Sequence, residues 1–277
     1  MQLAEPTVSA WKARLSLEFD FENQKTTLSR KAHDGPLVVQ KPLYPEGEEI
    51  CHAIIVHPPG GIAGGDELAL NARTEEHAAA LLTTPGAAKW YRSAGPWAKQ
   101  SVAFDVKGTL EWLPQETIVF DGALAQTSYD VNLGADAALI GWDIVCLGRT
   151  GSGERFARGN YRTSIQVRRG GRLLWLERGR VEGGGGLMDS QAGLAGKPVF
   201  GTLFASALNL NQDLLNATRT VEPEEGRGAV TLLPGILLAR YLGGSGEAAR
   251  RYFIALWRIL RPALTGREAT EPRIWQT

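Results

Sequence analysis

The sequence is poor in cysteine and has no long apolar run. Cys51 and Cys146 are its only cysteines in 277 residues, too few for a disulfide framework or a four-thiolate zinc site. We therefore expect a reducing, cytoplasmic compartment. No apolar stretch approaches the roughly 18 residues that span a bilayer, and charged side chains occupy residues 1–22, where a signal peptide would be apolar. These absences predict a protein that neither associates with membranes nor is secreted.

Histidine is also scarce, and motifs for covalent catalysis are missing. All four histidines lie within the first 77 residues, so a metal site elsewhere in the chain would have to be acidic. No serine stands in a G-x-S-x-G elbow, neither cysteine has a local hydrolase signature, and no nucleotide-binding motif is complete. We expect no organic cofactor and no acyl-transfer activity. A hydrolase that uses Glu116 with Asp121 or Asp143 stays open, because paired carboxylates meet in space rather than in sequence.

The charges balance overall but not locally. Thirty Lys and Arg accompany 30 Asp and Glu, yet residues 149–180 contain nine arginines against Glu154 and Glu177. These arginines either line the solvated face of antiparallel strands or meet an acidic partner. No helix-turn-helix, zinc-finger or RNP pattern accompanies them, so we expect no nucleic acid as a partner.

Alternation of apolar and polar residues dominates most of the chain. Residues 13–21 place leucine and phenylalanine on one face and polar side chains on the other, which is typical of a half-buried strand. Further strand candidates are residues 27–31, 50–57, 67–72, 78–84, 100–106, 108–113, 117–120, 128–133, 137–146, 161–169, 172–178 and 199–209. The pattern predicts a mainly β fold, within one domain over residues 1–277, with a few helices towards the C-terminus.

A weak internal repeat bears on how these strands are arranged. Similar segments recur about every 30 residues, at 78–86, 108–116, 137–145 and 171–179. Units of this length can stack as short strands in a superhelical, β-helix-like coil. Chance similarity among the strands of a β-sandwich would give the same pattern, so both arrangements remain open.

The end of the chain changes to helical spacing. Apolar residues recur at intervals of four from Ala248 to Leu260, which predicts an amphipathic helix over 247–260 that ends at Pro262. The polar tail after it closes on Ile274 and Trp275. These two side chains either pack onto the chain's own core or dock into another protein.

The densest local signal is the segment HPPGGIAGGDEL, residues 57–68. His57 ends a predicted strand, two prolines follow it, and the glycines allow positive φ and close approach of the backbone. These glycines are Gly60, Gly61, Gly64 and Gly65. Asp66 follows directly, and its carboxylate would serve either as an oxygen ligand or as an acceptor for the loop's own backbone.

Two further carboxylates interrupt apolar strands. Asp143 stands in GWDIVCLG and Glu177 in LLWLERG. Burying a carboxylate is unfavourable unless a partner, water or a cation meets it, so both residues suggest a polar site within the β core. Alternation leaves open that each points to the solvated face of its strand instead.

Five ordered blocks resemble the urease accessory protein UreD family, called UreH in some bacteria. The blocks are HPPGGIAGGDEL, TTPGAAKWYRS, LEWLPQETIVFDGA, WDIVCLGR and the terminal LRPALTG…PRIWQT, and they extend over nearly the whole chain. The resemblance implies a non-enzymatic chaperone that acts with UreF and the GTPase UreG to deliver nickel to apo-urease. It also implies a mostly β fold of stacked strands.

By position, the resemblance assigns two sets of residues. The acids of a transient nickel path are Asp66, Asp143 and Glu177, whose weak oxygen ligands would let the ion leave. A serine that some relatives have before the lysine of the PGA-x-K block is Ala88 here. The C-terminal segment 246–277 is expected to contact UreF through Tyr252, Phe253, Trp257, Arg261, Ile274 and Trp275. A scaffold that binds the same partners without passing nickel is the alternative.

Overall fold

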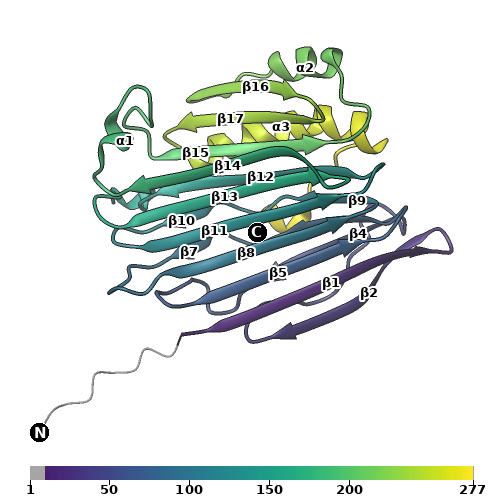
Figure 1. The fold of residues 1–277 in the computed structure, drawn as a ribbon, viewed down its shortest axis with the longest axis horizontal. Coiled ribbons are helices and arrows are strands. Elements are labelled where there is room, and N and C mark those ends of the chain that lie inside the picture. Colours follow the sequence, from purple (N-terminus) through teal and green to yellow (C-terminus); the bar gives the residue numbers. More distant parts are fainter. Residues whose placement is uncertain (1–9, 277) are drawn as a thin grey trace, which may run out of the picture.

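Two β-sheets face each other in the computed structural model, which describes residues 10–276 (Figure 1). The first has seven strands in the order β14 (Arg172–Glu182), β13 (Asn160–Arg169), β11 (Leu124–Leu133), β8 (Ala98–Val106), β5 (Glu67–Thr74), β1 (Lys12–Glu22) and β2 (Lys25–Asp34). The strands from β13 to β1 run parallel, and β14 and β2 are the antiparallel edges.

The second sheet has ten strands. Its main path is β16 (Arg227–Leu233), β17 (Ile236–Gly243), β15 (Val199–Ser206), β12 (Ala138–Leu147), β9 (Thr109–Trp112), β6 (Ala79–Thr83), β4 (Ile50–Val56) and β3 (Val38–Val39). Two short strands branch from it, β10 (Thr117–Val119) beside β12 and β7 (Ala88–Trp90) beside β10. The helices are α1 (Gly186–Asp189), α2 (Gln212–Arg219) and α3 (Gly246–Thr265), with 3₁₀ turns η1 (Thr150–Ser152) and η2 (Arg273–Gln276).

The 30-residue repeat corresponds to successive turns of a coil in which the chain passes from one sheet to the other. The pairs β5–β6, β8–β9 and β11–β12 each add one strand to each sheet, and equivalent positions stack in parallel, so that Ala79 pairs with Thr109 and Thr109 with Ala138. The first three repeat segments therefore occupy equivalent turns. The mainly β fold of stacked strands is confirmed.

The fourth repeat segment, residues 171–179, is not another turn of the coil. A tight turn at Gly170 and Gly171, both with positive φ, folds β14 back against β13 in the seven-stranded sheet. The similarity of this segment to the others reflects only a shared strand pattern. Four observed strands, β3, β7, β16 and β17, were not predicted. Strands β3 and β7 have only two and three residues, and β17, ILLARYLG, is mostly apolar and does not alternate.

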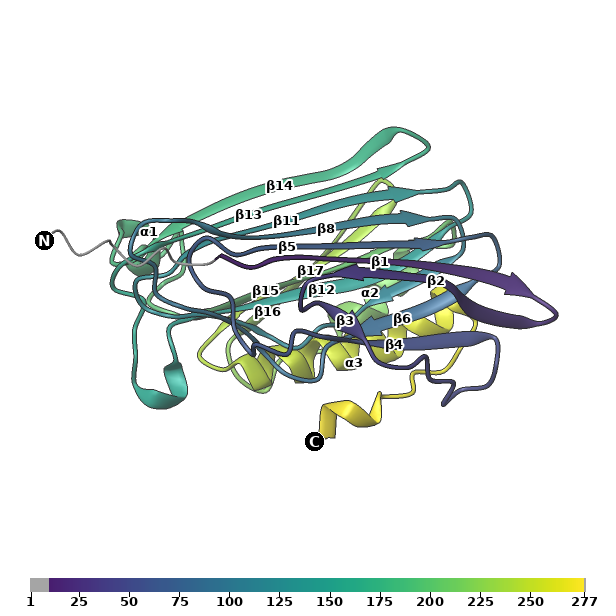
Figure 2. The same ribbon diagram turned by 90° about the horizontal axis from the view of Figure 1, so that it is seen from below.

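Two apolar cores stabilise the molecule. One fills the space between the sheets and includes Leu15, Phe104 and Leu139. The other lies between the outer face of the ten-stranded sheet and α3, where Trp142 packs near Phe253 (Figure 2). The ten-stranded sheet therefore has apolar packing on both faces.

Helix α3 extends beyond the predicted end at Pro262. Ser245 caps its start, where the hydroxyl accepts a hydrogen bond from the Ala248 N–H, and Gly266 closes it with φ of 70°. Pro262 lies in the last turn, where its missing N–H removes one intrahelical bond and leaves the later ones in place. No helix of the described residues is long and apolar enough to cross a membrane.

Candidate functional site

The glycine-rich loop connects β4 to β5 and packs tightly against residues 91–96. A Cβ on Gly61 would lie 2.2 Å from the Tyr91 ring, and one on Gly64 would lie 2.3 Å from Ser93 Oγ. Gly60 and Gly65 instead have positive φ, 75° and 96°. The loop thus needs glycine for two different reasons, close approach and backbone conformation.

Asp66 holds this loop together. Its side chain is buried, with Oδ1 accepting from the Trp11 N–H at 2.8 Å and Oδ2 from the Ala63 N–H at 2.8 Å. Both carboxylate oxygens therefore bind backbone. In this conformation Asp66 has the structural role that the sequence left open.

His57, at the start of the same loop, lines a cavity of about 270 Å³ together with Gly60, Gly61 and Trp112. Its Nε2 is buried and has no hydrogen-bond partner among the described residues. Burial lowers the pKa of the imidazole, and the nearby negative charge of Asp66 opposes this only in part. His57 is therefore neutral near pH 7.

Asp143 lies on β12 and faces the space between the sheets, while its neighbour Trp142 faces α3. Only 6% of the residue is exposed. Burial raises the pKa of the carboxyl to about 7, and hydrogen bonding to Thr117 and Tyr161 offsets this only in part. Two buried phenols, Tyr129 and Tyr161, have pKa values raised by burial and also by the charge of Asp143.

Glu177 reaches into the same inter-sheet space from β14. Its carboxylate pairs with both terminal nitrogens of Arg240 on β17, with Nη1 at 2.8 Å from Oε1. Arg240 Nη1 also donates to Thr202 Oγ1 at 2.6 Å. The strand register places Asp143 opposite Thr202 and Thr202 opposite Arg240. The structure thus brings Asp143 and Glu177 onto one row of polar residues between the sheets.

We call the residues Asp143, Thr202, Arg240 and Glu177 the inter-sheet polar row. Asp66 does not belong to it, since its oxygens bind the loop backbone. Sequence reasoning missed Thr202 and Arg240, although Arg240 in the apolar segment ILLARYLG breaks its strand in the way that Asp143 does. Within residues 10–276, no three His, Cys, Asp or Glu side chains converge as a metal cluster.

The residues predicted to bind a partner at the C-terminus lie in the chain's own second core. Tyr252, Phe253, Trp257 and Trp275 are at most 8% exposed, and Ile274 packs at the border of this core. The Trp275 indole N–H donates to Thr83 Oγ1 at 2.8 Å. The structure therefore shows the self-packing arrangement, and a partner role for these side chains stays a prediction.

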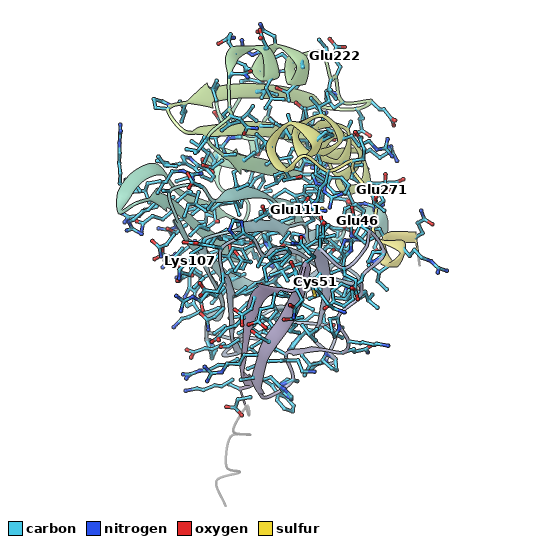
Figure 3. All side chains as sticks on the ribbon, turned by 90° about the vertical axis from the view of Figure 1, so that its right-hand side faces the viewer. Glu46, Cys51, Lys107, Glu111, Glu222 and Glu271 are labelled. Carbon is cyan, nitrogen blue, oxygen red and sulfur yellow. The ribbon has the colours of Figure 1, made fainter. Side chains whose placement is uncertain are left out.

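Arg261 is the charged member of that set and is fully buried. Its Nε donates to Glu111 Oε1 at 2.9 Å, its Nη2 donates to Glu46 Oε1 at 2.8 Å, and Trp257 Nε1 donates to Glu111 Oε2 at 2.6 Å. Glu46 and Glu111 lie near each other in Figure 3. His52 contacts Glu46 as well, with Nε2 2.6 Å from Oε1. This buried charge cluster ties α3 to β9 and to the segment before β4.

The two glutamates of the cluster titrate in opposite directions. Burial raises the pKa of Glu46, but hydrogen bonds from His52 and Arg261 outweigh it and lower the pKa to about 2. Glu111 is fully enclosed, and burial raises its pKa despite Arg261. Asp121, one acid of the alternative hydrolase pair, binds Arg158 and accepts hydrogen bonds from the backbone N–H groups of residues 157 and 158.

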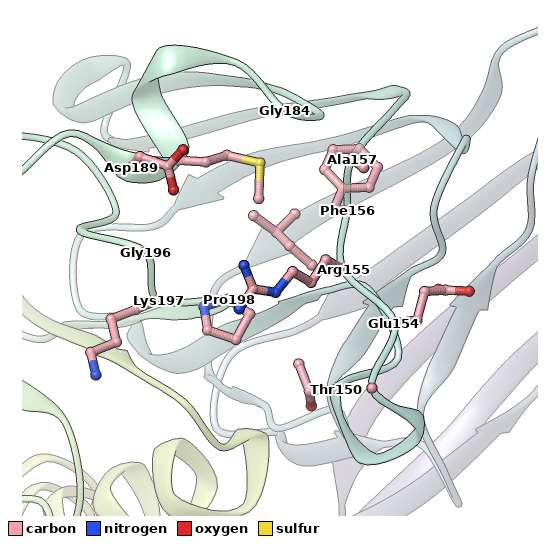
Figure 4. Close-up of a pocket in the computed structure, with 13 residues that line it drawn as sticks. Thr150, Glu154, Arg155, Phe156, Ala157, Gly184, Asp189, Gly196, Lys197 and Pro198 are labelled. Atoms are coloured by element: carbon pink, nitrogen blue, oxygen red, sulfur yellow. The ribbon is translucent and has the colours of Figure 1, made fainter.

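A second cavity, of about 340 Å³, lies beside α1 (Figure 4). Arg155, Lys197 and Asp189 line it with the glycine run that includes Gly184. The short helix α1 starts at Gly186, the last residue of the glycine run 183–186. The cavity contains none of the predicted metal or partner residues.

Comparison with known proteins decides the family. The profile of the UreD urease accessory protein family matches residues 12–276. The chain belongs to the UreD family. It is 52% identical to the urease accessory protein UreD of Azoarcus sp. (strain BH72) over 269 residues, 96% of this chain and 94% of the relative. It is 51% identical to the UreD proteins of Dechloromonas aromatica and Pseudomonas aeruginosa PAO1, with 100% of this chain and at least 99% of each relative covered.

Proposed function

We propose that this protein is a non-enzymatic, cytoplasmic maturation factor that joins apo-urease to UreF and UreG and passes Ni(II) along the inter-sheet polar row. Its place in the UreD family supports the accessory role, because the relatives are named urease accessory proteins. The observation that supports nickel passage is Asp143. This carboxylate is buried between the sheets and forms no salt bridge with any cation of the described residues.

The pKa of Asp143 suits transient binding of a divalent cation. A carboxyl with a pKa of about 7 is partly protonated near neutral pH, and an approaching cation would displace its proton. The oxygens near this carboxylate belong to Thr117, Tyr161 and Thr202. They are hard ligands, which bind Ni(II) more weakly than imidazole or thiolate does. Weak oxygen ligands let the ion move on, whereas clustered cysteines and histidines would retain it.

The positive charge of Arg240 opposes nickel binding at Glu177. Its guanidinium lies between the two acids of the row and is held by Glu177 and Thr202. A divalent cation next to it meets a repulsive charge. Glu177 therefore becomes available to nickel only when Arg240 moves away, and the Asp143 carboxylate is the first acid of the row that can accept the ion.

The test uses apo-urease co-expressed with UreF, UreG and either the native chain or Asp143→Asn. Asparagine keeps the shape of the side chain and removes its charge. We expect the complex on size-exclusion chromatography to be unchanged, while the nickel content of urease, measured by plasma mass spectrometry, falls several-fold. Asp20→Asn is the control, because Asp20 is a partly exposed carboxylate on β1.

The outcomes separate passage from scaffolding. Normal nickel content with Asp143→Asn in an intact complex would favour the purely scaffolding role. A complex that fails to form with the native chain would overturn the accessory role itself. Turnover of glycoside or ester substrates by the isolated chain would favour the hydrolase alternative.

The partner contact is proposed for the outward side of segment 246–277. The buried side chains of this segment are occupied, whereas Arg251 and Arg258 project outward from α3. Reversal of both charges, R251E with R258E, should weaken co-purification with UreF while leaving the fold intact.

A further inference from the structure

Strand β14 is a long sheet edge, and one of its two sides pairs with no other strand of the described residues. It has 11 residues, pairs only with β13, and lies at the outer margin of the seven-stranded sheet (Figure 2). An edge strand presents a row of backbone N–H and C=O groups that can pair with another chain. Proteins usually blunt such edges.

The strands at the other ends of the two sheet paths are β2, β16 and β3. Strand β2 has exposed charged residues in its second half, including Arg30 and Lys31. Strand β16 is covered by α2, from which Arg219 Nε donates to the Val230 carbonyl at 3.0 Å. Strand β3 has two residues. At 11 residues, β14 is the longest of these edge strands.

Exposed leucines lie along β14. Leu173 is 48% exposed and Leu176 is 42% exposed. An uncovered apolar edge strand is either a site of aggregation or a site of binding.

The arginine-rich stretch surrounds this edge, and the structure shows which of its charges are satisfied. Three of them form ion pairs outside β14: Arg149 with Glu154, Arg158 with Asp121 and Arg168 with Asp130. Arg169 is bound to the carbonyls of residues 134, 135 and 137.

Strand β14 contains three arginines, of which only Arg180 forms an ion pair within the described residues. Arg172 and Arg178 are exposed and form no ion pair with any residue between positions 10 and 276. Arg180 pairs with the exposed Glu182 at 3.6 Å and also faces the side-chain amide of Asn160. Arg172 precedes the exposed leucines on this strand, and Arg178 and Arg180 follow them.

We propose that β14 binds an extended, acidic segment of a partner protein, which adds to the seven-stranded sheet as a further strand. Backbone hydrogen bonds would supply affinity, the leucines apolar contact, and Arg172, Arg178 and Arg180 the selection for glutamate and aspartate. A second copy of this chain is a poor occupant, because two arginine-rich edges repel each other. The proposal does not depend on nickel passage.

The experiment uses the full chain and a fluorescein-labelled peptide of 11 residues, the length of β14, in which glutamate alternates with threonine and valine. Fluorescence anisotropy measures binding, and hydrogen exchange locates it. We expect saturable binding with new protection confined to β14 amides. R172E with R178E should weaken it at least about tenfold, about 1.4 kcal/mol.

Two controls isolate the mechanism. K12E with R14E makes the same charge change on β1 of the same sheet, where both side chains are exposed, and should leave binding unchanged. A peptide with the same charges but N-methylated at alternate residues should not bind, because it cannot form the backbone hydrogen bonds of an added strand.

Equal binding of the methylated peptide, equal binding to R172E/R178E, or protection at β2 would each overturn strand addition at β14. Absence of binding, or concentration-dependent dimerisation through β14, would overturn the acidic partner.

Discussion

The three carboxylates predicted to bind nickel have different surroundings: Asp66 and Asp143 are buried, whereas the Glu177 side chain is 29% exposed. Asp66 accepts two backbone N–H groups and Glu177 pairs with Arg240, so both have fixed structural partners. Asp143 has only neutral neighbours, and burial raises its pKa to about 7. Of the three predicted nickel ligands, Asp143 is therefore the one whose charge is uncompensated.

This uncompensated charge predicts a pH-dependent stability. An unfolded aspartate has a pKa of 3.8 and the folded Asp143 about 7, so the folded state holds one more proton between these values. The free energy of unfolding should then fall by about 1.4 kcal/mol per pH unit from about pH 4 to pH 7. Asp143→Asn should remove this slope in urea denaturation at pH 5, 6 and 7. Identical slopes for the variant and the native chain would show that Asp143 does not titrate in this range.

Helix α3 is an integral part of the core, and its attachment is both apolar and ionic. Ten of its residues are buried, and Arg261 joins it to Glu46 and Glu111 within the second core. A buried ion pair contributes little compared with an apolar replacement of the whole group, but removing one partner leaves buried charge behind. The position of the helix thus depends on Arg261 more than on its surface pairs.

Replacement of Arg261 should therefore be costly. Arg261→Met leaves Glu111 buried without a cation, and we expect the free energy of unfolding to fall by about 3–5 kcal/mol. Arg258→Met is the matched control on the same helix, since Arg258 pairs with Glu271 at the surface, and should change stability by less than about 1 kcal/mol. Guanidinium denaturation of both variants measures the difference, and similar losses would contradict a structural role for the cluster.

At the scale of the whole molecule, sequence patterns predicted local structure better than the contacts between distant segments. Alternation located most strands, and the repeat placed three turns of the coil in register, because both depend on local periodicity. The contact of Glu111 with Arg261 joins residues 150 positions apart, and no local pattern marks it. The pairing of Glu177 with Arg240 across two sheets escaped prediction for the same reason.

The C-terminal segment gives the sharpest test of how far the core extends. A chain that ends at Gly246 lacks Tyr252, Phe253 and Trp257, all buried against the ten-stranded sheet. Loss of one buried aromatic side chain costs about 3–5 kcal/mol, and whole domains are stable by only about 5–15 kcal/mol. We therefore expect the truncated chain to be insoluble or to lack a cooperative thermal transition by circular dichroism. A truncated chain that unfolds cooperatively would show that α3 is a separable element, and only then would loss of a partner on truncation locate the binding surface.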